Sequence, residues 1–229
     1  MARKTRKAAS EDMRERLLRA AEKLFAARGI TNVSLREISR KAGANTALLH
    51  YHFGSKLKFY EAFVRRCLEP VNHERLRLLE ECEAKTGSKL QPVLRKVIYA
   101  WVAPALMRES TTGEPALLIR LYGDIVAQTD PIFRKAQMPY SKDTIGRFVD
   151  AFERALPDLD PLEVHLRFYY LVGIVRSICT DPVLLEQLTD GGLSFSNLNE
   201  LVDRIVDSTA AVLAAPIQAP ASARKRLGG

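Results

Sequence analysis

One short stretch, residues 33–56, constrains the fold of this chain more than any other, and it has the sequence VSLREISRKAGANTALLHYHFGSK. Ser34 followed three residues later by Glu37 forms a capping box, which predicts that a helix begins at the next residue. Gly43 ends that helix, because glycine adopts the left-handed backbone of a helix exit without steric cost. A second short helix, capped by Asn45, follows almost at once. Two short helices joined by a tight glycine-containing turn are typical of the helix-turn-helix motif, whose second helix enters the major groove of DNA.

The same spacing fits a helical hairpin that serves only packing, and the charge distribution favours DNA binding over that alternative. Residues 1–70 hold 16 Lys and Arg against 7 Asp and Glu, whereas residues 71–229 hold 19 against 20. The excess behind the net charge of +8 therefore lies around the motif. A basic segment beside a near-neutral one indicates a polyanionic partner for the first alone.

Two sets of positions also link the chain to a known family. In and after the motif they are Ala42-Gly43, Leu49, Tyr51-His52-Phe53 and Ser55-Lys56, and in the preceding helix they are Leu17, Ala20, Ala21, Leu24, Phe25 and Gly29. Together, over about residues 10–60, they resemble the DNA-binding domain of the TetR/AcrR family of bacterial transcriptional regulators. The resemblance implies a DNA-binding N-terminal domain, a C-terminal helical bundle, a homodimer and a small-molecule effector.

The exposed start of the second helix carries the candidate base contacts. Thr46 and Leu48 are the first choices, Leu48 through a thymine methyl group, and Ala47 permits close approach of the backbone. By resemblance and by chemistry, the phosphate contacts are Tyr51 and Lys56. The full predicted set is Arg36, Asn45, Thr46, Ala47, Leu48, His50, Tyr51, His52 and Lys56, and His50 stands where most of the family carry tyrosine.

His50 and His52 do not suggest a metal site. Residues two apart face different sides of a helix, and neither a carboxylate nor a cysteine lies near them in the sequence.

The rest of the pattern is helical, and no alternation typical of a strand lasts five residues. We therefore predict an all-α fold of about nine helices. Pro70 is expected to kink or break the long helix that connects the two domains. The predicted organisation is a disordered basic arm (1–9), a helix-turn-helix domain (10–56), a connecting helix (56–84), an effector-binding and dimerisation domain (85–215) and a disordered tail (216–229). The basic arm is either a solvated tail or a contact to phosphates or the minor groove.

The larger domain carries aromatic and isolated polar residues that are typical of a ligand cavity, and equally of an ordinary core. Arg120 and Arg176 are less easily explained as core residues, because an arginine inside an apolar helix requires an anion. Asp124 is the simplest partner for Arg120, and a ligand carboxylate is the alternative. The candidate ligand-binding residues are Trp101, Arg120, Tyr122, Tyr140, Phe148, Phe152, His165, Phe168, Tyr169 and Arg176.

Two segments, LLIRLYGDIV and LRFYYLVGIVRS, are similar to TetR-like regulators that sense fatty acyl compounds. The resemblance implies a lipophilic effector such as a fatty acid or an acyl-CoA ester.

A single helix-turn-helix domain buries little surface on DNA, so specificity usually comes from two-fold dimers that bind palindromic half-sites. The resemblance implies that the last two long helices, predicted over residues 162–179 and 197–214, pack against the partner's copies. Their broad apolar character agrees, because such surface would otherwise face water.

Other protein classes find little support in the sequence. Three cysteines without C-x-x-C spacing predict neither disulfides nor zinc, and no cofactor motif is present. No nucleophile elbow or phosphate-binding loop suggests an enzyme. No apolar run reaches the ~20 residues of a membrane span, and we expect a cytoplasmic protein. A DNA-binding architectural protein without an effector remains the alternative to a ligand-responsive repressor.

Overall fold

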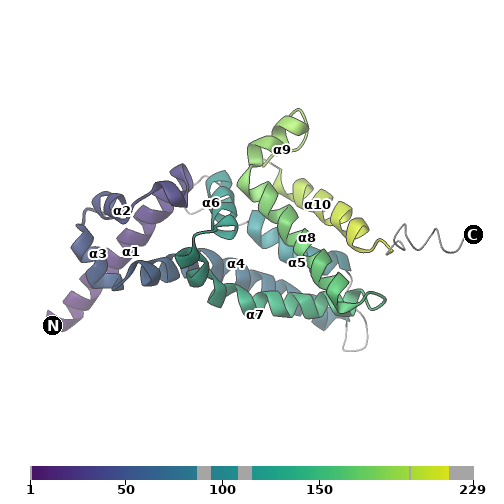
Figure 1. The fold of residues 1–229 in the computed structure, drawn as a ribbon, viewed down its shortest axis with the longest axis horizontal. Coiled ribbons are helices and arrows are strands. Elements are labelled where there is room, and N and C mark those ends of the chain that lie inside the picture. The colour runs from purple at the N-terminus through teal and green to yellow at the C-terminus, as the bar shows by residue number, and fades with distance from the viewer. Residues whose placement is uncertain (1, 87–93, 108–114, 196, 217–229) are drawn as a thin grey trace, which may run out of the picture.

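A computed structural model describes residues 2–86, 94–107, 115–195 and 197–216 of the chain (Figure 1). These residues form ten α-helices and one 3-10 turn and no strand, which confirms the predicted all-α class. The elements are α1 (Ala2–Arg28), η1 (Ile30–Asn32), α2 (Leu35–Lys41), α3 (Thr46–Phe53), α4 (Lys56–Thr86), α5 (Leu94–Leu106), α6 (Pro115–Ala127), α7 (Pro131–Ala155), α8 (Pro161–Thr180), α9 (Pro182–Leu188) and α10 (Leu198–Leu213).

The N-terminal part, which we call the head, consists of α1, α2 and α3. Its core is formed by fully buried side chains that include Leu17, Phe25, Ile38 and Leu49. α1 begins at Ala2, so the prediction of a disordered arm over residues 1–9 is wrong for all but the first residue, which lies outside the described ranges. The reason is that Ala, Arg and Lys dominate this segment, and all three favour helix even without a capping residue.

α4 runs from the head along the length of the larger domain (Figure 1). Pro70 lies within this helix without breaking it, and Pro139 lies in the same way within α7. Both prolines are exposed, so the carbonyl groups that lose their helical partners face water.

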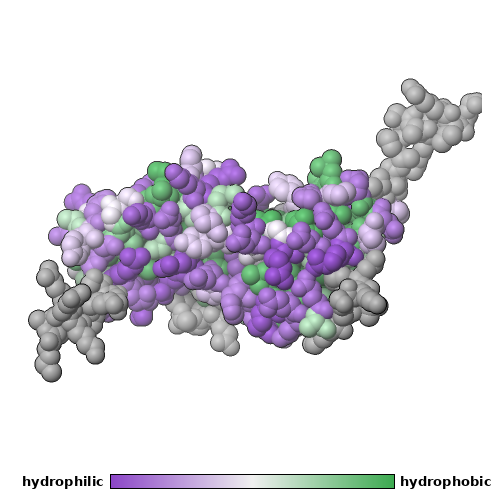
Figure 2. Space-filling model, turned by 90° about the horizontal axis from the view of Figure 1, so that it is seen from below, coloured by the Kyte–Doolittle hydropathy of each residue, from purple (hydrophilic) through white to green (hydrophobic). Residues whose placement is uncertain are grey.

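The larger domain packs α4 against α5 and α7, α6 against α8, and α10 against α5. Its centre is an aromatic cluster in which the Trp101 ring lies 5.0 Å from Phe148 and 4.8 Å from Phe168, and Phe152 lies 5.5 Å from Phe168, between ring centroids. The face seen in Figure 2 is mostly hydrophilic, as expected when the apolar residues fill such a core.

One prediction, the disordered tail over 216–229, lies almost wholly outside the described residues. In the described part of the chain, no helix is both long enough and apolar enough to cross a membrane.

Candidate functional site

The capping box that begins α2 is present in the structure. The Glu37 backbone N–H donates to Ser34 Oγ at 3.2 Å, and the Ser34 backbone N–H donates to Glu37 Oε2 at 2.9 Å. Arg28 at the end of α1 donates to Glu37 Oε1 at 2.8 Å. The hydrogen bond from the Ser34 backbone, followed by those from Arg28 and the Ser34 hydroxyl, lowers the pKa of Glu37 to about 2. One carboxylate therefore caps α2 and ties it to α1.

The backbone conformation of Gly43 and two hydrogen bonds fix the turn between α2 and α3 and the start of α3. Gly43 has φ +71°, the left-handed conformation that the sequence predicted at this exit. Arg16 from α1 donates to the Ala42 carbonyl at 2.7 Å, which closes the C-terminal end of α2. Asn45 Oδ1 accepts from the Leu48 backbone N–H at 2.8 Å, which confirms Asn45 as the cap of α3.

α3 presents its predicted contact residues to solvent. Ala47, His50 and Tyr51 are exposed, Tyr51 by 73 %, whereas Leu49 and Phe53 are buried and hold the helix on the head. Of the remaining predicted residues, Arg36, Asn45 and Lys56 are exposed, and Thr46, Leu48 and His52 are half-buried.

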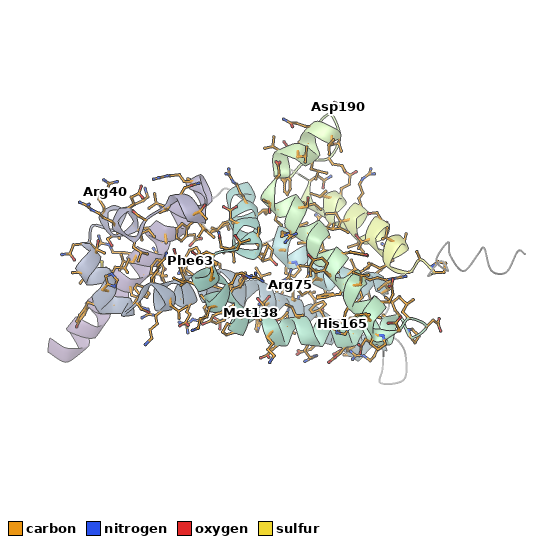
Figure 3. All side chains as sticks on the ribbon, viewed as in Figure 1. Arg40, Phe63, Arg75, Met138, His165 and Asp190 are labelled. Carbon is orange, nitrogen blue, oxygen red and sulfur yellow. The ribbon has the colours of Figure 1, made fainter. Side chains whose placement is uncertain are left out.

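A hollow between α2 and α3 is lined by Arg36, Arg40, Asn45 and Thr46, among others. Arg40 was not among the predicted residues, although its position four residues after Arg36 places both on one face of α2. Figure 3 shows Arg40 at the outer edge of the head. In the described ranges, His50 and His52 are not part of any cluster of His, Cys, Asp and Glu that could hold a metal ion.

The larger domain contains a cavity of about 320 Å³ between α4, α5, α6, α7 and α8. Three predicted ligand residues line it: Trp101, Tyr122 and Arg176. The other predicted residues do not. Arg120, His165 and Tyr169 are exposed, Tyr140 is half-buried, and Phe148, Phe152 and Phe168 belong to the buried aromatic cluster. Arg120, His165, Tyr140 and Tyr169 therefore do not line this cavity. Phe148, Phe152 and Phe168 take the core position that the sequence analysis gave as the alternative, because the spacing of aromatics along a helix does not tell which face meets a cavity.

Two arginines of this domain are buried, Arg75 and Arg167, and only Arg75 lines the cavity. It lies in the helix that the sequence analysis treated only as a connector. Arg75 is 3 % exposed and lines the cavity. Its Nε donates to the Trp101 carbonyl at 2.9 Å, and its guanidinium carbon lies 3.8 Å from the centre of the Trp101 ring. A signal existed in the sequence: Arg75 shares the apolar stripe of α4 with Val71, Leu79 and Cys82.

α6 connects the cavity with the head. Tyr122 lines the cavity, and a Cβ added at its neighbour Gly123 would lie 2.5 Å from the backbone of Cys179 in α8. Asp124 faces α1, because a Cβ added at Gly29 would lie 3.5 Å from Asp124 Oδ2. Burial raises the pKa of Asp124, and the charge of Arg120 opposes that shift. α6 therefore lies in contact with both the cavity and the C-terminal end of α1.

α8 and α9 leave large apolar side chains exposed. On α8 they are Leu162, Leu166, Tyr169 and Tyr170, and on α9 they are Val183, Leu184 and Leu188. Leu162 is 79 % exposed and Tyr169 is 64 % exposed. Contiguous apolar surface of this kind marks an interaction site on a protein.

A helix-turn-helix head on an all-helical domain with an internal cavity defines the class of helix-turn-helix transcriptional regulators. The profile described as "Bacterial regulatory proteins, tetR family" matches residues 17–63, and the profile described as "Tetracyclin repressor-like, C-terminal domain" matches residues 99–211. The chain belongs to the TetR family of DNA-binding transcriptional regulators.

Among curated proteins, the chain is 27% identical over 215 residues to an uncharacterized HTH-type transcriptional regulator of Mycobacterium tuberculosis, covering 94% of this chain and 90% of that protein. It is 37% identical over 71 residues to the HTH-type transcriptional regulator SrpR of Pseudomonas putida. That second match covers 31% of this chain and a third of SrpR (33%).

Solved structures share the fold. NalD, the secondary repressor of the MexAB-OprM multidrug efflux pump in Pseudomonas aeruginosa, superposes with a TM-score of 0.54 at 20% identity, over 86% of this chain and 96% of NalD. A TetR-family regulator from Mesorhizobium loti superposes with a TM-score of 0.55 at 20% identity, over 89% of this chain and 97% of its own.

Proposed function

We propose that this chain forms a homodimeric repressor, which binds a palindromic DNA operator through α3 and leaves it when a small molecule occupies the cavity. The observation that carries the proposal is the continuity between the two sites. α6 lines the cavity through Tyr122 and packs on α1 of the head through Asp124. Occupation of the cavity would therefore change the position of the head relative to the larger domain.

The head supplies both kinds of contact that operator binding requires. Thr46, Ala47 and Leu48 lie at the start of α3, where a recognition helix contacts base edges. Tyr51 and Lys56 are exposed and able to reach phosphates, and Arg36 and Arg40 add positive charge on α2.

The dimer would form through α8 and α10, with α9 beside them. The exposed apolar residues of α8 support this arrangement, because a second copy of the chain would remove them from water. Two-fold symmetry would then set two copies of α3 about one helical turn of DNA apart, which corresponds to a palindromic operator. Since its operator is chromosomal DNA, the protein would act in the bacterial cytoplasm.

The test is binding to DNA fragments that flank the protein's own gene, over a series of salt concentrations. Lys56→Ala removes one phosphate contact from each protomer of the dimer, so it should weaken binding and reduce the salt slope by about 2. Lys96→Ala is the control: it removes an exposed charge from α5 and should leave the operator affinity and the salt slope unchanged. Unchanged affinity and slope in Lys56→Ala together with Tyr51→Ala would overturn the assignment of this surface to DNA.

A further inference from the structure

The guanidinium of Arg75 is held in place from several sides and still has one nitrogen without a partner. Nε donates to the Trp101 carbonyl at 2.9 Å, and Nη1 donates to Asn72 Oδ1 at 3.4 Å. Asn72 is itself fixed, because its Nδ2 donates to the Tyr140 carbonyl at 2.5 Å. Nη2 is buried and makes no hydrogen bond.

A second unpaired donor belongs to the same cavity. Trp101 Nε1 is also buried without a hydrogen-bond partner, and both residues line the cavity. A buried donor without an acceptor costs about 1–3 kcal/mol, and more when it is charged. Two such donors in residues of one cavity therefore indicate a missing acceptor, and a carboxylate has two oxygens to offer.

The buried charge of Arg75 in this cavity is balanced by nothing in the described part of the chain. The lining also contains Arg134 and Arg176, which are exposed to solvent, and none of the described lining residues is Asp or Glu. Within the described ranges no carboxylate forms an ion pair with Arg75. Figure 3 shows Arg75 in the interior of the larger domain, away from the exposed ends of the helices.

The neighbouring titratable groups leave this charge uncompensated. Burial raises the pKa of Cys179 to about 12, even though the charge of Arg75 opposes the shift, so the thiol stays protonated at neutral pH. Burial likewise raises the pKa of Tyr122, again against the effect of Arg75. Both groups are therefore neutral at neutral pH, and neither supplies a negative charge beside Arg75.

We propose that the effector of this regulator is a small carboxylic acid with an apolar or aromatic body, and that Arg75 Nη2 and Trp101 Nε1 bind its carboxylate. The proposal rests on the proposed function, because it assigns the chemistry of the effector in that same cavity. The apolar body of the acid would lie against Leu68, Val126, Val172 and Val175. Discrimination against uncharged analogues follows, because these would leave the buried guanidinium unpaired.

The size and charge of the cavity favour a free acid over a CoA ester. A volume of about 320 Å³ is at the lower end of the ligand pockets of ≈ 300–1,000 Å³ found in proteins. An acyl-CoA ester has no charge at its acyl end, since its negative charge lies on phosphates far from the thioester. It would leave Arg75 without an anion.

Trp101 allows a direct test, because it is the only tryptophan in the chain. We would titrate the full-length protein with benzoate, phenylacetate and octanoate and follow Trp101 fluorescence. The primary amides of the same three acids have nearly the same shape without the charge. A saturable response to at least one acid at up to millimolar concentration, with binding of its amide about tenfold weaker or more, is the expected result. No saturable response to any acid, or amides that bind as tightly as acids, would overturn the proposal.

Two variants assign the binding to Arg75. Arg75→Met keeps the length of the side chain without its charge, and Arg75→Lys keeps the charge without the fork of donors. Both should weaken binding of the acid about tenfold or more, and amide binding should change little. Arg77→Met is the matched control, because Arg77 lies on the same helix and faces solvent. Thermal unfolding of each variant shows whether it is folded. If Arg75→Met does not fold, Arg75→Lys alone provides the test. Unchanged binding of the acid in a folded Arg75 variant would overturn the proposal.

Operator affinity, measured with and without the acid, separates the proposed acid site from the proposed release from DNA. If an acid binds at Trp101 and weakens operator binding, both stand. If it binds and operator affinity does not change, the acid site stands and the proposed release from DNA fails. If the protein binds its operator and no acid binds, the regulator stands and the acid effector is wrong.

Discussion

Gly123 offers a sharp test of how α6 and α8 pack beside the cavity. A Cβ at this position would lie 2.5 Å from the carbonyl carbon of Cys179, 2.7 Å from its oxygen and 2.7 Å from the backbone nitrogen of Thr180. Ordinary contacts between carbon atoms are about 3.5–4.0 Å, so Gly123→Ala would force the two helices apart by about 1 Å. The obstacle is backbone, which cannot move away as a flexible side chain can.

The expected loss follows from two opposing effects. Overpacking of this kind costs about 1–3 kcal/mol, whereas replacing glycine by alanine inside a helix gains about 1 kcal/mol. We therefore expect Gly123→Ala to lower the free energy of unfolding by up to about 2 kcal/mol. Gly146→Ala on α7 is the matched control, because a Cβ there meets nothing within 4 Å. This control should gain up to about 1 kcal/mol, so the two variants should differ by the overpacking cost of about 1–3 kcal/mol.

The measurement is urea denaturation, followed by Trp101 fluorescence and by far-UV circular dichroism at one fixed protomer concentration. Equal m-values in the three proteins would show that the midpoints compare the stability of the folded state. If Gly123→Ala proved as stable as Gly146→Ala, α6 and α8 would not be in backbone contact. The path from the cavity through α6 to the head would then lose its support.

Two further perturbations test other parts of the structure. The pKa of Glu37, about 2, is below its ordinary value of 4.5, so its carboxylate stabilises the fold above pH 4.5 and loses that contribution as the pH falls toward 2. Glu37→Gln should therefore lower stability more at about pH 7 than at about pH 3 in urea denaturation, and an equal loss at both would contradict the role of the charge. At the proposed interface, Leu162→Glu together with Tyr169→Glu should convert the dimer to a monomer in sedimentation, whereas Ile132→Glu on α7 should not. A double variant that stays dimeric would move the interface away from α8.

The head was predictable because its determinants are local. Ser34 and Glu37 cap α2 across three residues, Asn45 caps α3 across three, and Gly43 fixes the turn by itself. Interactions over such short separations depend little on the rest of the fold, so the sequence contains them completely. The start of α1 was missed for a related reason: no capping residue marks Ala2, and helix propensity alone extends the helix.

The cavity was predictable only in part. Trp101, Tyr122 and Arg176 were correctly assigned to it, whereas Tyr169 lies on an exposed face. Arg75 was missed, although it lies on the apolar stripe of α4. An arginine on such a stripe is buried only if neighbouring helices cover it, and here Trp101 of α5 provides that cover at 3.8 Å.

The sequence by itself determined that this protein is all-α, that its N-terminal part is a basic helix-turn-helix domain, and that it belongs with the TetR regulators. The first two properties follow from periodicity, capping and charge, which act within a few residues along the chain, and the third follows from the resemblance of residues 10–60 to that family. Only the tertiary structure decided which buried arginine lines the cavity, which aromatics surround the cavity and which helix contacts both the cavity and the head. Those properties depend on which faces of distant helices meet, and Gly123, Arg75 and Trp101 acquire their roles only through residues far away in the sequence.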